Sequence, residues 1–199
     1  MHIAEGFLRP EILIAGGVVG GAFAAYAFKT VENEELPKVA ACSALFFLAS
    51  FVHISIGISS VHLILSGIVG ALLGVRAFVA IGTALLLQGL LFGFGGITTL
   101  GINLCILALP ALLARALFVV RLKSAVLTRI NWFLIGFLPI ALGTILLALA
   151  LAINGEGFWL AAEAAFVAHI PIMFLEGVIT LLAFGFLQRV RPELLKVER

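Results

Sequence analysis

Long stretches without charged side chains run through this sequence. Residues 77–114 contain no Asp, Glu, Lys or Arg, and residues 130–155 contain none either. A helix needs about 20 apolar residues to span the hydrocarbon of a bilayer, and these stretches are long enough to supply them. Only 11% of all residues are charged, against about a quarter in a soluble domain. The sequence therefore predicts an integral membrane protein and disfavours an unusually apolar soluble helical protein.

Charges, glycines and prolines divide the apolar sequence into about seven helical spans. We expect them near 11–28, 39–54, 62–75, 77–93, 99–119, 132–152 and 160–187. Because only Arg76 separates the third span from the fourth, a count of six with one re-entrant segment stays open. The alternation of apolar and polar residues typical of a membrane barrel is missing. We expect an all-α integral membrane protein, with residues 1–199 as a single membrane domain and residues 1–10 as an external segment.

Lysine and arginine residues predict the orientation of these spans, because they collect in cytoplasmic loops. Alternate loops and helix ends hold eleven of the twelve: Lys29, Lys38, Arg76, Arg115, Arg121, Lys123, Arg129, Arg189, Arg191, Lys196 and Arg199. The opposite side holds only Arg9. We therefore expect the N-terminus outside the cell and the C-terminus in the cytoplasm.

All four histidines fall on the predicted external side. His2 lies in the N-terminal segment, and His53 and His62 flank the turn "HISIGISSVH". His169 lies in the outer half of the last span. Histidine is the commonest metal-binding side chain and binds through the neutral imidazole. This distribution suits a protein that collects a substrate from the exterior.

The dipeptide Met1–His2 carries the donors of a metal chelator. The Met1 amine, the His2 backbone nitrogen and His2 Nδ1 can close a five-membered and a six-membered ring on one ion. A second imidazole, such as that of His62 in "SSVHL", would complete the square nitrogen geometry typical of Ni(II) or Cu(II). Residues 1–10 lack the basic region and apolar stretch of a signal peptide, so we expect the amine to be retained. The alternative is a histidine solvated at a frayed terminus.

Four segments resemble one family, in the same order. They are "MHIAEGFL" at the start, "GISSVHLILSGIVGALLG" at 57–74, "LLLQGLLFGFGGITTLGIN" at 85–103 and "HIPIMFLEGVITLLAFGFLQRVRPELL" at 169–195. Together they resemble the CbiM/NikM family, the substrate-capture membrane components of energy-coupling-factor (ECF) transporters for cobalt and nickel. The resemblance implies that the Met1 amine, the backbone and imidazole nitrogens of His2, and His62 hold the metal. It also implies a prokaryotic cell (inner) membrane as the location.

The resemblance further implies partner proteins. A transmembrane coupling subunit and two cytoplasmic ATPase subunits would be separate chains, which fits a sequence without a GxxxxGK[ST] phosphate loop. The need for a small accessory membrane subunit is left open, and no nucleic acid partner is expected. Small residues that recur at helical spacing in the first span permit close helix approach: Gly16, Gly17, Gly20, Gly21, Ala24 and Ala25. In ECF systems such residues face the coupling subunit; internal packing is the alternative.

Polar residues inside the spans are candidates to support the metal site. Gln88 and Asn103 are expected to brace two helices or to hydrogen-bond close to the metal. His53 stands where nickel relatives often have Asn, so it is a metal ligand, a partner that orients His62, or a surface residue. The glycine-rich stretch "GFGGITTLG" is expected to turn tightly beside the N-terminal segment.

Two residues of the last span lie on one face of its helix, because His169 and Glu176 are seven residues apart. For Glu176 we favour a structural hydrogen bond or ion pair over a proton-coupled step or a metal relay. Phe94 stands where many relatives carry Asp or His, which removes a polar contact expected near the site.

These observations favour a transport component over an enzyme. We expect capture of divalent cobalt for cobalamin biosynthesis, with nickel capture as the alternative, and no resident cofactor. Cobalt is placed first because "SSVHL" followed by "FGFGG" resembles cobalt-named relatives, although nickel binds most nitrogen sites more tightly. A vitamin-capture subunit would need an aromatic-lined pocket, and the chain has one Tyr and two Trp. An intramembrane enzyme would have to use His169 and Glu176, without an HExxH motif.

Overall fold

The computed structural model describes residues 2–51, 53–56 and 59–195, with side chains described outside residues 53–61. Most of these residues are helical. The α-helices are α1 (Pro10–Lys29), α2 (Leu36–Ala49), α3 (Ser66–Leu73), α4 (Ala77–Phe92), α5 (Leu100–Phe118), α6 (Ala125–Ile153) and α7 (Trp159–Val190). Short 3-10 helices span Asn33–Glu35, Gly74–Arg76, Glu156–Phe158 and Pro192–Leu195. The expected predominantly helical fold is confirmed.

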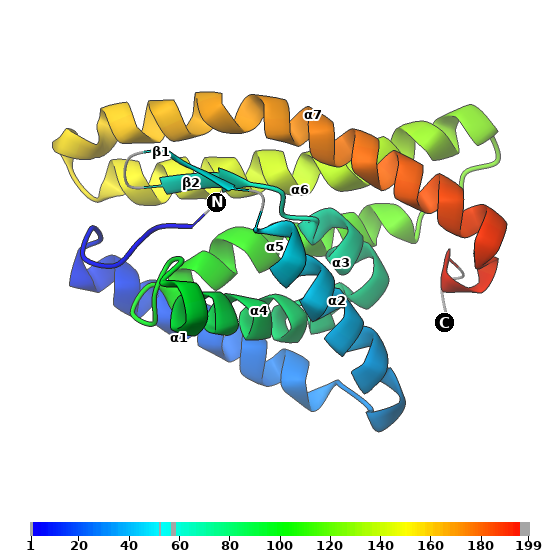
Figure 1. Cartoon of the computed structure of the whole chain (residues 1–199), viewed down its shortest axis with the longest axis horizontal. Helices are drawn as coiled ribbons and strands as arrows, with labels where there is room; N and C mark the ends of the chain where they lie inside the picture. Colours follow the sequence, from blue (N-terminus) through cyan, green and yellow to red (C-terminus); the bar gives the residue numbers. More distant parts are fainter. Residues whose placement is uncertain (1, 52, 57–58, 196–199) are drawn as a thin grey trace.

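The helices form one bundle (Figure 1). The two longest, α6 and α7, lie side by side along their lengths, and α5 packs on α6. On the other side of α5 lie α1 and α4, and α2 packs on α4. The short helix α3 fits between α5 and α6, and it also touches α7. This arrangement brings the start of α3 into the centre of the bundle.

A β-hairpin between α2 and α3 departs from the predicted all-α fold. Strands β1 (His53–Ile56) and β2 (Ser59–His62) pair antiparallel, with His53 opposite His62. The helix expected over 39–54 therefore ends at Ala49, and the one expected over 62–75 begins only at Ser66. The apolar character of this stretch suits strand and helix equally, and its β-branched Ile and Val residues favour the strand.

Five segments of the described chain are long and apolar enough to cross a membrane. They are Pro10–Lys29, Ser66–Phe92, Leu100–Phe118, Ala125–Ile153 and Glu156–Val190. Helix α2 has 14 residues and α3 has eight, and each alone is shorter than the roughly 20 residues that a crossing needs. Helix length therefore supports five spans, where the sequence suggested about seven.

The boundary at Arg76 is a sharp turn between α3 and α4. Gly74, which follows the last residue of α3, has φ +59°, a left-handed conformation that glycine adopts without strain. The Arg76 guanidinium donates to the Thr30 carbonyl (2.9 Å) and pairs with Glu35 (2.8 Å). The arginine thus ties the α3–α4 turn to the α1–α2 connection.

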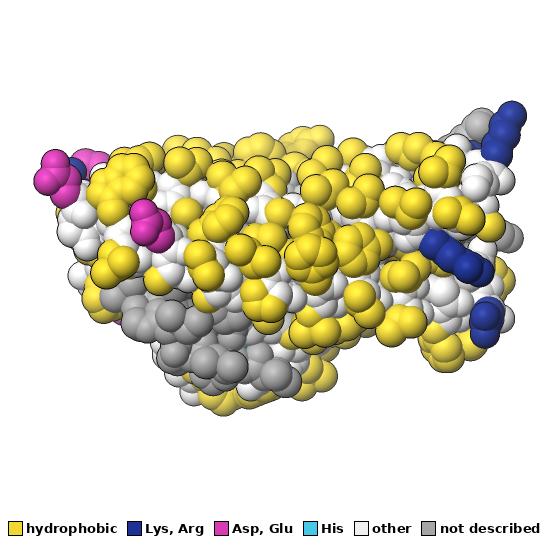
Figure 2. Space-filling view, turned by 90° about the horizontal axis from the view of Figure 1, so that it is seen from above, with side chains coloured by type: hydrophobic (Ala, Val, Ile, Leu, Met, Phe, Trp, Pro, Cys, Tyr) yellow, Lys and Arg dark blue, Asp and Glu magenta, His cyan; other side chains and the backbone are white. Residues whose placement is uncertain are grey.

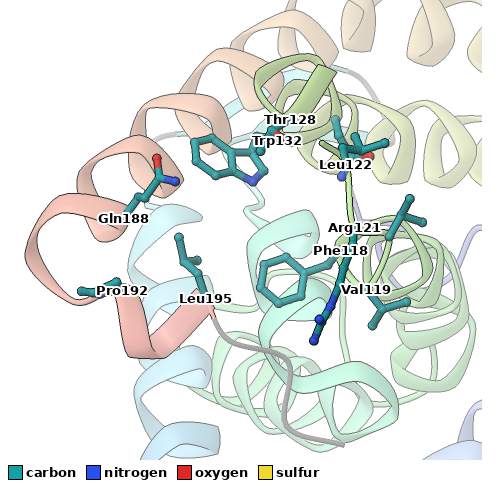
Figure 3. Close-up of a pocket in the computed structure, with 11 residues that line it drawn as sticks. Phe118, Val119, Arg121, Leu122, Thr128, Trp132, Gln188, Pro192 and Leu195 are labelled. Carbon is teal, nitrogen blue, oxygen red and sulfur yellow. The ribbon is translucent and has the colours of Figure 1, made fainter. Parts of the chain in front are cut away.

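The surface has the pattern of a multi-pass membrane protein. Figure 2 shows hydrophobic side chains along the length of the bundle, with Lys and Arg mainly at one end and Asp and Glu at the other. At the basic end, the ends of α5 and α7 and the start of α6 surround a cavity of about 650 Å³. Figure 3 shows several side chains around it, among them Phe118, Trp132 and Gln188. On this face the exposed charges thus lie toward the two ends of an apolar surface.

Candidate metal-binding site

The N-terminal segment folds back against the helices and is held by two asparagines. Ile3 N–H donates to Asn103 Oδ1 (2.9 Å), and Asn103 Nδ2 donates to the Ile3 carbonyl (3.0 Å). Asn154 makes the same kind of pair further along: its Oδ1 accepts from Arg9 N–H and its Nδ2 donates to the Phe7 carbonyl, both at 2.7 Å. Each amide satisfies backbone groups that lie away from bulk water, so the segment is pinned at both ends.

The middle of the N-terminal segment is fastened to the glycine-rich loop between α4 and α5. Glu5 N–H donates to the Gly95 carbonyl (3.1 Å), and Thr98 N–H donates to Glu5 Oε1 (2.9 Å). The Thr98 bond holds the pKa of Glu5 below its ordinary value. Gly95 and Gly96 have φ +78° and +141°, and a Cβ on Gly96 would overlap the Glu5 side chain. The expected tight turn beside the segment is confirmed.

These contacts bring His2 onto His62. The two imidazole rings stack with centroids 4.5 Å apart and planes 16° apart. Exposure is 4% for His2 and 2% for His62. His62 is the last residue of β2, and His2 is set by the Ile3–Asn103 pair that follows it. Two imidazoles that are distant in the sequence are thus stacked together in the interior of the protein.

The His62 ring is oriented by a backbone hydrogen bond. Its Nδ1 lies 2.8 Å from the Leu63 carbonyl oxygen, and since a carbonyl only accepts, Nδ1 carries the proton and Nε2 keeps a lone pair. Nε2 is buried and has no hydrogen-bond partner among the described residues. Burial lowers the pKa of His62, which lies outside the five candidate spans, well below its usual range. The ring is therefore neutral at neutral pH, the form that binds metals.

The other predicted site residues divide between two roles. Asn103 contacts the backbone next to His2, as described above. Gln88 donates to Ser50 Oγ (2.7 Å) and so braces α4 against α2, which is the structural alternative. The backbone of His53 pairs with that of His62, but its side chain lies outside the described residues. Met1 lies outside them as well.

The two titratable residues on the buried face of α7, His169 and Glu176, are both hydrogen-bonded. Glu176 accepts hydrogen bonds from backbone N–H groups at the start of α3, which agrees with the favoured structural role. His169 Nδ1 donates to the Ala165 carbonyl (2.6 Å), one turn earlier in the same helix. No described residue pairs with either through an ion pair.

The small residues of α1 face two different ways. A Cβ on Gly16 or Gly20 would overlap α5, at Ile102 and at Gly101 respectively. Gly16 and Gly20 therefore serve internal packing against α5, and the docking role predicted for these two residues is corrected. Gly17 and Gly21 have open space above them. Small residues line a groove of about 720 Å³ there: Gly17, Gly21, Ala24, Ala25, Gly82 and Gly101.

The sequence analysis missed residues that hold the N-terminal segment in place. Asn154, Thr98 and Glu5 all contribute hydrogen bonds. Glu5 and Thr98 lie in segments that the sequence analysis singled out, but none of the three was assigned a role. The available signal was positional: Asn154 ends the sixth apolar run and Thr98 precedes the fifth, both on the side predicted for residues 1–10. Their pairing with Arg9 and Glu5 spans 145 and 93 residues, which no local pattern encodes.

The fold and the site define a multi-pass helical membrane protein whose N-terminal segment carries His2 onto the buried imidazole of His62. The model of the CbiM family, described as the cobalt uptake substrate-specific transmembrane region, matches residues 2–194. The chain belongs to this family, whose members are components of cobalt and metal transporters.

Known relatives span nearly the whole chain. A Haemophilus influenzae protein provisionally named a metal transport protein is 37% identical over 200 residues, covering 98% of this chain and 97% of that one. The cobalt transport protein CbiM of Anoxybacillus flavithermus is 32% identical, covering 94% and 82%. A crystal structure of a transition metal transporter has a TM-score of 0.81 at 24% identity, covering 96% of this chain and 93% of that one. This last likeness supports the fold.

Proposed function

We propose that this chain captures divalent cobalt from outside the cell as the substrate-specificity component of an ECF importer. Nickel capture by the same site is the alternative, and cobalamin biosynthesis is the use we assign to the cobalt. The observation that carries the proposal is the buried stack of His2 on His62, with the lone pair of His62 Nε2 unused by the described residues. A neutral imidazole with an unused lone pair is a ready donor for such an ion.

The donor set we propose is the Met1 amine, the His2 backbone nitrogen, His2 Nδ1 and His62 Nε2. Among the described residues, no three side chains of His, Cys, Asp or Glu lie together as a metal site. In our proposal, main-chain nitrogens at the N-terminus supply the donors that the described side chains do not. Metal–imidazole distances are about 2 Å, and each nitrogen lone pair lies in the plane of its ring. The two rings, whose centroids are 4.5 Å apart, would therefore have to rotate out of their stack for one ion to bind both.

The whole chain, residues 1–199, would act as one membrane domain, with residues 1–10 as its external metal-binding segment. The proposed orientation, N-terminus outside and C-terminus in the cytoplasm, is supported by the bias of lysine and arginine in the sequence. The proposed partners are a transmembrane coupling subunit and two cytoplasmic ATPases. Whether the transporter also uses a small accessory membrane subunit is decided by purifying the assembled complex.

For the coupling subunit we propose the groove beside Gly17 and Gly21, because small residues allow a second helix to approach closely. Gly21→Leu is expected to leave metal binding intact but to abolish uptake and co-purification with the partners, since its side chain fills the groove. Gly185→Leu is the matched control, because Gly185 on α7 also has open space above it. Normal co-purification of Gly21→Leu would show that this groove is not the docking surface. Gly20→Leu is expected to destabilise the bundle itself.

Calorimetry on the purified full chain tests the proposed substrate. Titrations with Co2+, Ni2+ and a set of water-soluble vitamins are compared in the same detergent. We expect saturable one-to-one binding of the metals and none of the vitamins, with the tighter metal identifying the substrate. Binding of a vitamin without binding of either metal would contradict the proposal and favour a vitamin-capture subunit.

A further inference from the structure

The Glu176 carboxyl group, in the middle of α7, reaches the chain that follows His62. Its side chain is fully buried. Oε1 accepts hydrogen bonds from the N–H groups of Ile64 (2.5 Å) and Leu65 (2.9 Å), and Oε2 lies 3.0 Å from the Leu65 nitrogen. A carboxyl group buried away from water is costly unless it is hydrogen-bonded. These two backbone groups therefore explain how the bundle tolerates Glu176.

The start of α3 needs such a partner. Leu65 is the N-cap of α3, and its side chain offers no hydrogen bond to the unpaired N–H groups of the first turn. It also has φ +58°, a left-handed conformation that is uncommon for a residue with a side chain. Glu176 accepts from the N–H of Leu65 itself and from that of Ile64 before it, so it fixes the backbone that leads into the helix. It holds the bend that joins β2 to α3.

One peptide group connects this clamp to the candidate metal ligand. It joins Leu63 to Ile64: its N–H donates to Glu176 Oε1, and its carbonyl oxygen accepts from His62 Nδ1. Hydrogen bonds in series polarise one another and become stronger. The series from Glu176 through the peptide to His62 therefore resembles the carboxylate–histidine–metal arrangement of many metal sites, with one peptide group inserted.

We propose that Glu176 is a positioning residue for metal capture, which acts through this peptide group to hold His62 with its lone pair on Nε2. The inference rests on the proposed function, in which His62 Nε2 binds the ion. Because Nδ1 donates to the Leu63 carbonyl, only Nε2 has a lone pair available to bind the ion. The ring is also kept next to His2. Without the clamp, the bend after His62 loses its partner, and the ring loses both its fixed tautomer and its orientation.

Glu176→Gln tests the proposal with little change in shape. The amide keeps one oxygen that can accept from Ile64 and Leu65, but its nitrogen is a donor and faces the Leu65 N–H where Oε2 accepts in the native chain. The amide also cannot carry a negative charge, so the clamp is weakened. We expect the affinity of the purified chain for Co2+ and Ni2+ to fall about 10–100-fold, the usual effect of losing a partner that orients a ligand. The visible absorption of bound metal should shift, because its ligand geometry changes. Unchanged affinity and absorption in Glu176→Gln would overturn the proposal.

Thr180→Val is the matched control. Thr180 lies one turn further along the same face of α7, is fully buried, and has a hydroxyl without a hydrogen-bond partner among the described residues. Valine has nearly the same shape, so a polar group is removed without touching the clamp. We expect metal affinity and absorption to stay at the unsubstituted values. If Thr180→Val and Glu176→Gln lose metal affinity equally, Glu176 has only a general packing role, and the proposal is overturned.

A second measurement needs no substitution at Glu176 and no metal. In protein labelled with nitrogen-15 at histidine, ring nitrogen shifts report which nitrogen carries the proton, and the His62 signals are those missing from His62→Ala. We expect the proton on Nδ1. A proton on Nε2 would overturn the role of Glu176 even if His62 binds metal. Because the tautomer is read without metal, this result is independent of whether the proposed metal function holds.

Discussion

One alanine added before Met1 is expected to reduce uptake of labelled cobalt or nickel to the level of cells without the transporter. The proposed chelate uses the amine, the amide nitrogen and the imidazole of two successive residues. An added residue turns the Met1 amine into a second amide and changes the chelate rings, although His2 and His62 remain. Acetylation of the amine would have the same effect, because it removes the lone pair. Uptake is measured in cells that also carry the partner subunits.

A C-terminal tag is the control for this experiment. The C-terminal end of α7 lies at the end of the bundle away from the hairpin and the N-terminal segment (Figure 1), so a tag there should leave uptake unchanged. Normal uptake by the extended form would remove the amine from the donor set.

Acidification is expected to weaken metal binding by the native form. The amine must lose its proton to bind, and its reference pKa is roughly 7.7–8.0, so affinity should fall as the pH drops through that range. The pKa of His62 is lowered, so this ring is still neutral below pH 6.5 and does not cause the loss. Metal titrations between pH 8.5 and about 6.5, on the native and the Ala-extended forms, test whether affinity falls with falling pH. A metal affinity of the native form that does not change with pH would contradict the prediction.

His62→Ala is expected to abolish high-affinity metal binding. Loss of a group that only orients a ligand typically costs 10–100-fold in affinity, and loss of a donor should cost more than about 100-fold. Calorimetry with Co2+ and Ni2+ measures the effect on the purified chain. Circular dichroism should show unchanged helix content, since the ring stacks on His2 and donates to the Leu63 carbonyl, and none of these residues belongs to a helix. Binding at full affinity would exclude His62 as a donor.

The same titration on His53→Ala decides between the roles left open for that residue. A loss as large as that of His62→Ala identifies a ligand, and a loss of about 10–100-fold identifies a partner that orients His62. No change identifies a surface residue. The backbone pairing of His53 with His62 makes this comparison well matched, because both residues belong to one hairpin.

The helices and the chemistry of the site followed from local patterns. Predominantly apolar runs of sufficient length predicted α1, α5, α6 and α7, because a bilayer selects apolar side chains along a whole helix. The expected end of the span at 39–54 and the expected start of the span at 62–75 were wrong. His53–Ile56 and Ser59–His62 pair there as strands, and hydropathy does not distinguish a short buried strand from a helix.

The proposed donors could be read from the sequence, because a histidine next to an amine and a second histidine in a predicted external loop are properties of a few adjacent residues. The proximity of His2 to His62 was decided by packing. Asn103 and Asn154 reach back 100 and 145 residues to seat the N-terminal segment, and Glu176 reaches 112 residues to the bend after His62. The two glycine stripes of α1 are equivalent by spacing, yet an added Cβ would overlap α5 only at Gly16 and Gly20, and not at Gly17 or Gly21. Periodicity records which residues share a helix face, whereas the neighbour of that face depends on the packing of the whole bundle.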